Sequence, residues 1–165
     1  MLFFNKFYHP EGKTMEHASM YEALQFAIKL EEEGILFYEN WASKAKGNVK
    51  ETLKKLALDE IKHKAYFKGL YDELKDKPEV DYLFNEEVTA YFRNYAVSAA
   101  FNREQVKLNT IKDAVEEGIL TETNSIEYYK FLLINSNEST REILKKIITE
   151  EQGHLVILEK LLLEA

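Results

Sequence analysis

Apolar residues recur at helical spacing along four long stretches of the chain. In the first stretch they follow one another at steps of three or four residues, at Ala23, Ala27, Leu30, Gly34, Tyr38 and Trp41. Steps of this size place side chains on one face of a helix. No stretch alternates apolar and polar residues with a period of two for long enough to predict a strand. The pattern therefore predicts an all-α protein.

Four helices are predicted, at about residues 19–46, 48–76, 109–135 and 139–164. Gly47 separates the first two, and Ser139 opens a Ser-x-x-Glu capping box before the fourth. The segment of about residues 77–108 is long enough to run the length of a bundle and contains a predicted short helix. We expect one domain over residues 1–165, a four-helix bundle of two antiparallel helix pairs joined by this crossover.

The two predicted helix pairs resemble each other in sequence. When the chain is shifted by 91 residues against itself, without a gap, residues 19–74 lie over residues 110–165. Apolar and polar positions then match, including Ala23/Ala114, Ile35/Ile126, Glu31/Glu122, Tyr38/Tyr129, Leu53/Leu144, Glu60/Glu151, His63/His154 and Leu70/Leu161. The chain is interpreted as two copies of one helix pair.

Each copy carries a Glu-x-x-His motif on its second helix. Glu60 and His63 form the first motif, and Glu151 and His154 form the second. Residues three apart leave the same face of a helix. A carboxylate and an imidazole that point together into a bundle are costly to bury without a partner. A metal ion is a partner that suits both groups.

Two further glutamates complete the predicted metal site. Glu31 and Glu122 stand 29 residues before Glu60 and Glu151, respectively. In an antiparallel bundle these four glutamates and the two histidines would converge near the middle. Four ionised carboxylates in one buried site would repel one another, and two divalent cations would cancel their charge. This donor set favours iron, with manganese as the alternative, over a closed structural zinc site.

Glu31 is followed by Glu32 and Glu33, so the choice among them requires a reason. The 91-residue shift aligns Glu31 with Glu122, whereas it aligns Glu32 and Glu33 with residues that are not acidic. Glu31 also lies four residues after Ala27, on the apolar face. Glu32 and Glu33 are therefore expected on the solvated face or at its border.

Four other polar residues are candidates to support the ligands. Tyr38 and Tyr129 lie two turns after the glutamate of the first helix in each copy, where a phenol could donate to a ligand carboxylate on a facing helix. Asp59 and Glu150 each lie four residues before a predicted ligand histidine, and could orient the imidazole of the opposite helix pair. The alternative roles are aromatic core residues for the tyrosines and solvated surface acids for Asp59 and Glu150.

The composition limits the function classes. The chain contains no cysteine, which excludes disulfides, thiolate metal sites and iron–sulfur clusters within it and fits a reducing cytoplasm. A net charge of −7 argues against capture of nucleic acid or of an anionic membrane surface. No stretch approaches the roughly 20 apolar residues needed to span a bilayer. We expect a cytoplasmic protein without a nucleic-acid or membrane partner.

The chain opens with an apolar segment, Met1–Tyr8, which lacks the features of a signal peptide. It is interpreted as a short arm that packs on the bundle or on another subunit. A homodimer is expected, and this arm or the Tyr91-Phe92-Tyr95 stretch of the crossover could form its interface.

The motifs as a set resemble the ferritin-like di-iron carboxylate superfamily. A Glu-x6-Tyr helix followed by a Glu-x-x-His helix occurs twice. Glu31-x-x-Gly-x-x-Phe-Tyr38 together with Leu-Ala-Leu-Asp-Glu60-x-x-His63 is most similar to the rubrerythrin branch. The resemblance covers both copies of the helix pair. It implies a ferritin-like bundle with two iron ions, in which Glu60 and Glu151 bridge, Glu31 and Glu122 are terminal, and each metal has one histidine.

The resemblance also implies two-electron chemistry, in which the reduced metal pair reacts with peroxide or dioxygen. The sequence departs from typical rubrerythrins in two ways. It has no rubredoxin-type cysteine module, so electrons would come from a separate donor. Ser125 stands where rubrerythrins tend to place an additional ligand carboxylate, and this departure argues against their metal-shifting peroxidase cycle in this chain.

Three functions fit these observations. The first is a di-iron peroxidase or oxidase of oxidative-stress defence. The second is a ferritin-like protein that oxidises and stores Fe(II), which the acidic net charge mildly favours. The third is a metal-stabilised helical scaffold without turnover.

Overall fold

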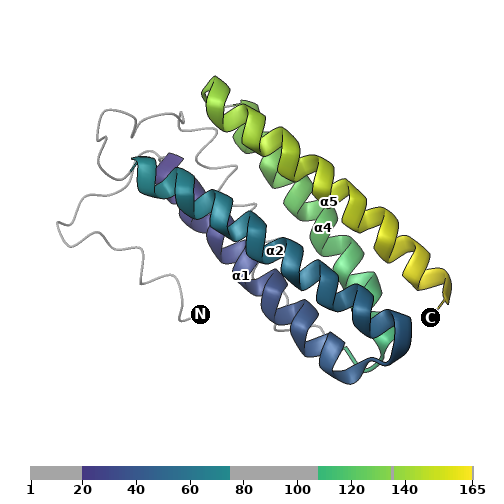
Figure 1. Ribbon diagram of the computed structural model, residues 1–165. Coiled ribbons are helices and arrows are strands. Elements are labelled where there is room, and N and C mark those ends of the chain that lie inside the picture. Colours follow the sequence, from purple (N-terminus) through teal and green to yellow (C-terminus); the bar gives the residue numbers. More distant parts are fainter. Residues whose placement is uncertain (1–19, 75–107, 135, 165) are drawn as a thin grey trace, which may run out of the picture.

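The computed structural model describes residues 20–74, 108–134 and 136–164. These residues form four helices and no strand, namely α1 (Met20–Lys44), α2 (Gly47–Leu74), α4 (Ile111–Ile134) and α5 (Glu138–Glu164). The helices run along one another as an elongated bundle (Figure 1). None of these helices contains an apolar stretch long enough to cross a membrane.

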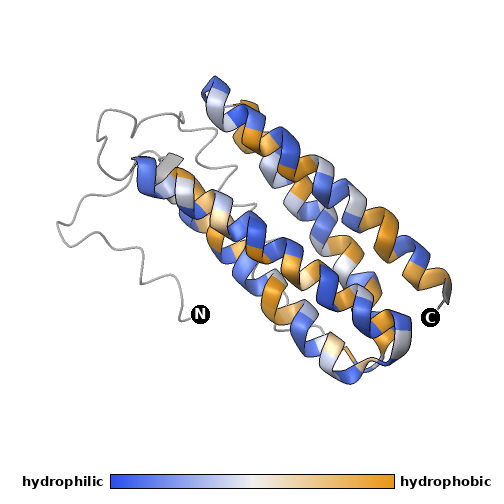
Figure 2. Cartoon of the chain, viewed as in Figure 1, coloured by the Kyte–Doolittle hydropathy of each residue, from blue (hydrophilic) through white to orange (hydrophobic). Residues whose placement is uncertain are grey.

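The bundle consists of two helical hairpins (Figure 1). Only two residues separate α1 from α2, so the second helix must return along the first. The chain reverses at Gly47, whose φ of 57° is a backbone conformation that residues with a side chain rarely adopt. Hydrophobic and hydrophilic residues are interspersed along every helix (Figure 2), as expected for helices that bury one face.

The apolar core lies in two parts. The first part joins the start of α1, the end of α2, the end of α4 and the start of α5, and includes Leu24, Phe67, Tyr128, Leu132 and Leu144. The second joins the opposite ends of the same helices, and includes Trp41, Leu53, Leu56, Val115 and Leu158. Along each helix, the residues between the two parts include buried polar side chains. The bundle is therefore apolar at both ends of its core and polar in the middle.

The start of α5 differs from the prediction. Ser139 was expected to cap this helix, but Asn137 does so: its Oδ1 atom accepts a hydrogen bond from the Thr140 backbone N–H at 2.9 Å. The Ser139 hydroxyl donates to the same Asn137 oxygen at 2.8 Å. The helix begins at Glu138, so Ser139 lies inside it and Asn137 is the residue in the capping position.

Several predictions lie outside the described residues. They are the apolar arm at Met1–Tyr8, the crossover of about residues 77–108 with its short helix, of which only residue 108 is described, and the Tyr91-Phe92-Tyr95 stretch.

The start of α4 is held by a reciprocal cap. The Thr110 hydroxyl accepts a hydrogen bond from the Asp113 N–H at 3.1 Å. The Asp113 carboxylate accepts in return from the backbone N–H groups of Asn109, at 2.9 Å, and Thr110, at 3.0 Å. These hydrogen bonds, first from Asn109 and then from Thr110, lower the pKa of Asp113 below its ordinary value.

Replacing Asp113 with Asn should lower the melting temperature at pH 7, since the amide is a weaker acceptor for the two N–H groups. The pKa of Asp113 is lower in the folded protein than in the unfolded chain, where it is about 3.9, so its carboxylate stabilises the folded protein above about pH 4. This stabilisation is lost as the pH falls through the lower pKa of the folded state. The difference from wild type should therefore shrink below about pH 4. Thermal unfolding measured by circular dichroism across this range checks it, with Glu116→Gln, an exposed acid of the same helix, as control. A pH-independent difference would contradict the cap.

Candidate metal centre

Six ionisable side chains are buried in the middle of the bundle. Each is at most 3% exposed, and every helix contributes: α1 and α4 give one residue each, and α2 and α5 give two. They are Glu31, Glu60, His63, Glu122, Glu151 and His154. All six predicted ligand residues thus meet in one place.

The six residues form two overlapping sets of four. In each set the carboxylate oxygens and the imidazole nitrogen lie within 4.8 Å of one another, so each set could hold one metal ion. The sets are Glu31, Glu60, His63 and Glu151, and Glu60, Glu122, Glu151 and His154. Glu60 and Glu151 belong to both. This geometry is what two carboxylates that bridge a pair of metal ions require.

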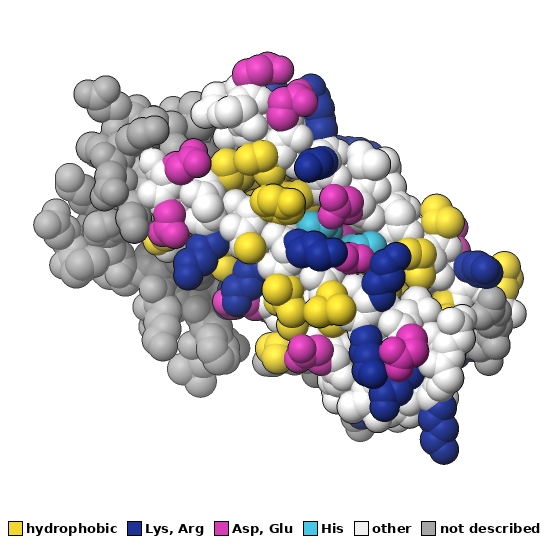
Figure 3. All heavy atoms as spheres, in the orientation of Figure 1, with side chains coloured by type: hydrophobic (Ala, Val, Ile, Leu, Met, Phe, Trp, Pro, Cys, Tyr) yellow, Lys and Arg dark blue, Asp and Glu magenta, His cyan; other side chains and the backbone are white. Residues whose placement is uncertain are grey.

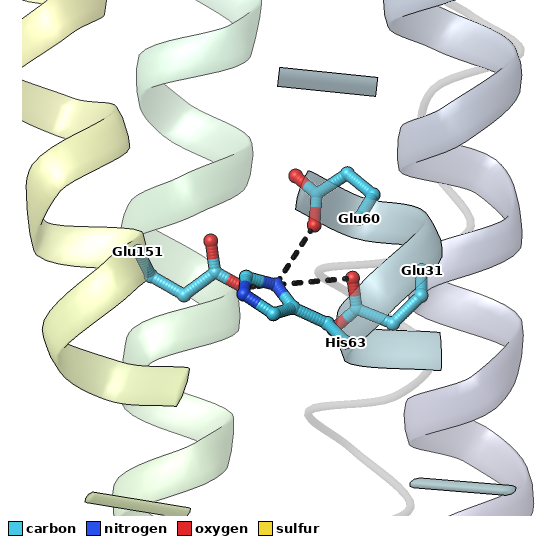
Figure 4. Close-up of side chains that lie close together, drawn as sticks. All are labelled: Glu31, Glu60, His63 and Glu151. Atoms are coloured by element: carbon cyan, nitrogen blue, oxygen red, sulfur yellow. Dashed lines mark hydrogen bonds and ion pairs between the residues drawn. The ribbon is translucent and has the colours of Figure 1, made fainter. Parts of the chain in front are cut away.

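The His63 ring points one nitrogen at the carboxylates of its set. Its Nδ1 atom lies 3.1 Å from Glu151, 3.2 Å from Glu60 and 3.9 Å from Glu31. Figure 4 shows these side chains converging from α1, α2 and α5. An imidazole lone pair aimed at carboxylate oxygens is repulsive unless a proton or a metal ion lies between them.

His154 takes the equivalent position in the second set. Its Nδ1 atom lies 2.8 Å from Glu151 Oε2, 3.6 Å from Glu60 and 3.7 Å from Glu122. His154 Nδ1 and Glu151 Oε2 are buried, yet neither makes a hydrogen bond within the described part of the chain. Buried polar atoms normally have a partner. A proton or a shared metal ion between these two atoms, which lie 2.8 Å apart, would satisfy both.

The outer nitrogen of each histidine faces an acid of the other hairpin. His63 Nε2 lies 2.9 Å from Glu150 Oε2 of α5. His154 Nε2 lies 3.7 Å from Asp59 Oδ2 of α2. The orienting role predicted for Asp59 and Glu150 requires a hydrogen bond to the imidazole, and the Glu150 contact is within that distance whereas the Asp59 contact is not. A small area of histidine is visible at the surface that α2 and α5 form, among acidic and basic side chains (Figure 3).

The two buried tyrosines also act across the bundle. The Tyr38 hydroxyl of α1 donates to Glu122 of α4, and the Tyr129 hydroxyl of α4 donates to Glu31 of α1. Burial raises the pKa of both phenols well above the ordinary value, and the neighbouring carboxylates raise it further. Both hydroxyls therefore keep their protons and remain donors, as the predicted supporting role for Tyr38 and Tyr129 requires.

Burial and mutual repulsion keep protons on some of the carboxyls. Burial raises the pKa of Glu31 and Glu60 well above the ordinary value, and neighbouring carboxylates add to the effect. Burial together with Glu151 raises the pKa of Glu122 to about 7. Without a bound cation, the cluster is not four ionised carboxylates at neutral pH.

The pKa values of Glu151 and of the two histidines shift in the direction opposite to the effect of burial. Burial alone would raise the pKa of Glu151, but its contacts with His154 and His63 lower it to about 2. Burial alone would lower the pKa of both imidazoles, but contacts with Glu151 raise that of His63 to about 9, and contacts with Glu122 and Glu151 raise that of His154 to about 10. Protons on the two imidazoles thus supply positive charge that bound metal ions would otherwise supply.

The neighbours of Glu31 lie where the sequence repeat places them. Glu32 is exposed and pairs with Lys64 at 2.9 Å, and Glu33 is half-buried. The sequence pattern did not predict that Lys62 lies near the site, where its Nζ atom is 2.6 Å from Asp59 Oδ1. Its spacing of three residues from Asp59 was the available signal.

A sequence profile of the rubrerythrin family matches residues 22–162. The chain belongs to the rubrerythrin family. The predicted resemblance to this family is therefore confirmed. The matched range of this rubrerythrin-family protein includes all six buried ligand candidates.

A crystal structure from Thermotoga maritima, described as that of a candidate ferritin-like diiron-carboxylate protein, is similar to this rubrerythrin-family chain. The sequences are 29% identical, the TM-score is 0.70, and the similarity covers 90% of this chain and 97% of that one. The predicted ferritin-like four-helix bundle is confirmed. No curated protein matches the chain.

Binding of Mn(II) should release protons. A metal-bound imidazole must be neutral and a metal-bound carboxylate ionised, whereas both histidines and several of the glutamates carry protons at neutral pH. The apparent affinity should therefore rise as the pH increases from about 6 to about 9. Titration of Mn(II) into weakly buffered protein with an indicator dye measures the protons released. An affinity that does not change with pH would contradict this charge balance.

Replacing Glu60 with Ala should weaken the retention of both metal ions by at least about tenfold, because Glu60 belongs to both sets. The metal-free variant should be more stable than metal-free wild type by about 1 kcal/mol, since one of four crowded acids is removed. Metal analysis and urea unfolding measure the two effects. Glu32→Ala, one residue from Glu31 but exposed, is the matched control and should retain metal.

Proposed function

We propose that this protein binds two iron ions through its six buried side chains and reacts with peroxide or dioxygen. The observation that carries the proposal is the pair of overlapping four-residue sets that share Glu60 and Glu151. Carboxylate oxygens combined with imidazole nitrogens are typical donors for iron, and manganese is the alternative metal. Family membership supports the same assignment.

The proposed ligand roles follow from the two sets. Glu60 and Glu151 would bridge, Glu31 and Glu122 would each bind one metal, and each histidine would bind through Nδ1, because that nitrogen faces the carboxylates. Two divalent ions would balance the four carboxylate charges, which supports a dinuclear site.

When bound, two ferrous ions would supply the two electrons that, together with two protons, convert one hydrogen peroxide molecule to two water molecules. The protein side chains would hold the ligands in position. Tyr38 and Tyr129 fix the carboxylates of Glu122 and Glu31 by hydrogen bonds, and the Glu150 carboxylate fixes the His63 ring. Burial of all six side chains excludes bulk water from the reacting centre.

Electrons would come from a separate donor, since the chain has no cysteine with which to hold an iron–sulfur or rubredoxin-type centre. The homodimer and the cytoplasmic location stay predictions from the sequence.

A second function is oxidation and storage of Fe(II) without an organic substrate. The acidic net charge of −7 favours it, because an acidic protein attracts cations. The two functions differ in how much iron the protein takes up and in how fast it reacts with peroxide.

Anaerobic loading with Fe(II), followed by addition of hydrogen peroxide, tests the proposal. We expect two irons per chain and oxidation of both by one peroxide within seconds, with Glu60→Ala losing the reaction and Glu32→Ala keeping it. Stopped-flow absorbance and iron analysis provide the measurements. Loading far beyond two irons per chain would favour storage, and a protein that binds no iron would contradict both functions.

A further inference from the structure

The two halves of the metal centre differ in charge at a position next to their outer acids. Lys62 and Gly153 are 91 residues apart and therefore correspond in the internal repeat. Lys62 pairs with Asp59 at 2.6 Å. Gly153 brings no charge to the corresponding place, and a Cβ atom added there would meet no atom within 4 Å. The repeat thus supplies one lysine, which pairs with Asp59 and is attracted more weakly by Glu150, and no second lysine at the equivalent point of the other half.

The two outer acids differ accordingly. The Glu150 side chain, 42% exposed, accepts from His63 Nε2 at 2.9 Å. The Asp59 side chain, 17% exposed, is bound to Lys62 through Oδ1, and its Oδ2 atom stays 3.7 Å from His154 Nε2. Only His63 has its outer nitrogen within hydrogen-bond distance of a carboxylate. Part of the difference is chain length, because glutamate reaches one methylene further than aspartate.

The outer hydrogen bond matters for the inner nitrogen. A carboxylate that accepts from Nε2–H fixes the tautomer in which Nδ1 carries the lone pair, holds the ring in place and makes Nδ1 a stronger donor. Loss of such a contact typically reduces metal affinity by 10–100-fold. A carboxylate that is already paired with a lysine is a weaker hydrogen-bond acceptor for an imidazole.

We propose that the two metal positions are inequivalent: the His63 position binds the first ion more tightly, with Glu150 as its positioning residue, while Lys62 holds Asp59 away from His154. This inference rests on the proposed metal-binding function. It predicts stepwise loading of a centre whose primary ligands are nearly symmetric.

Anaerobic titration with Mn(II) alone, followed by calorimetry and electron paramagnetic resonance, tests the inequivalence. In wild type we expect two steps whose dissociation constants differ by about tenfold or more, with the signal of a single uncoupled ion after the first equivalent. Glu150→Ala should weaken the tighter step by about 10–100-fold. Asp59→Ala should leave that step within about threefold of wild type.

Because one half has Lys62 where the other has Gly153, a lysine can be removed from the first half and added to the second. Lys62→Met releases Asp59 from its ion pair and should tighten the weaker step. Gly153→Lys places a lysine beside Glu150 and should weaken the tighter step. Gly153→Met is its matched control, since both replace an exposed helical glycine and only one adds a charge. Circular dichroism of the metal-free variants establishes that each is folded.

Two equal steps in wild type, or an Asp59→Ala variant that weakens the tighter step as much as Glu150→Ala does, would overturn the inequivalence and leave the proposed function intact. Absence of any Mn(II) or Fe(II) binding would overturn both.

Discussion

The mutual repulsion of buried acids is the constraint on which this structure depends. Four glutamates and two histidines occupy one layer of the core, each at most 3% exposed. Such a layer is stable only if positive charge enters it, either as protons or as metal ions. The raised pKa values of Glu31, Glu60 and the imidazoles are the response to this constraint in the absence of a cation. The proposed function uses the same constraint, since two divalent ions would replace those protons.

Internal duplication explains how one chain builds this layer. Each hairpin supplies part of the support for the other half: Tyr38 holds Glu122, Tyr129 holds Glu31, and Glu150 holds His63. These contacts cross between hairpins, so neither hairpin alone contains a complete site. The two parts of the apolar core on either side of the polar layer keep the hairpins aligned. Packing and site geometry are therefore linked.

Much of this arrangement was predictable because the repeat restricts the choices. Alignment with Glu122 selected Glu31 over the exposed Glu32, and helical spacing placed each Glu and His of a motif on one face. The residue at which α5 begins and the partners of exposed side chains were not predictable. Asn137 caps α5 because the helix begins at Glu138, earlier than the Ser-x-x-Glu pattern suggests, and Lys62 pairs with Asp59 through a flexible exposed side chain. The family match and the similar Thermotoga maritima structure agree with the fold predicted from the sequence.

Crystallography of the manganese-loaded protein, with anomalous diffraction, tests the central claim most directly. The account predicts two anomalous peaks in the middle of the bundle, each next to one histidine Nδ1 and both next to Glu60 and Glu151. A single peak, peaks confined to surface acids, or histidine ligation through Nε2 would contradict it.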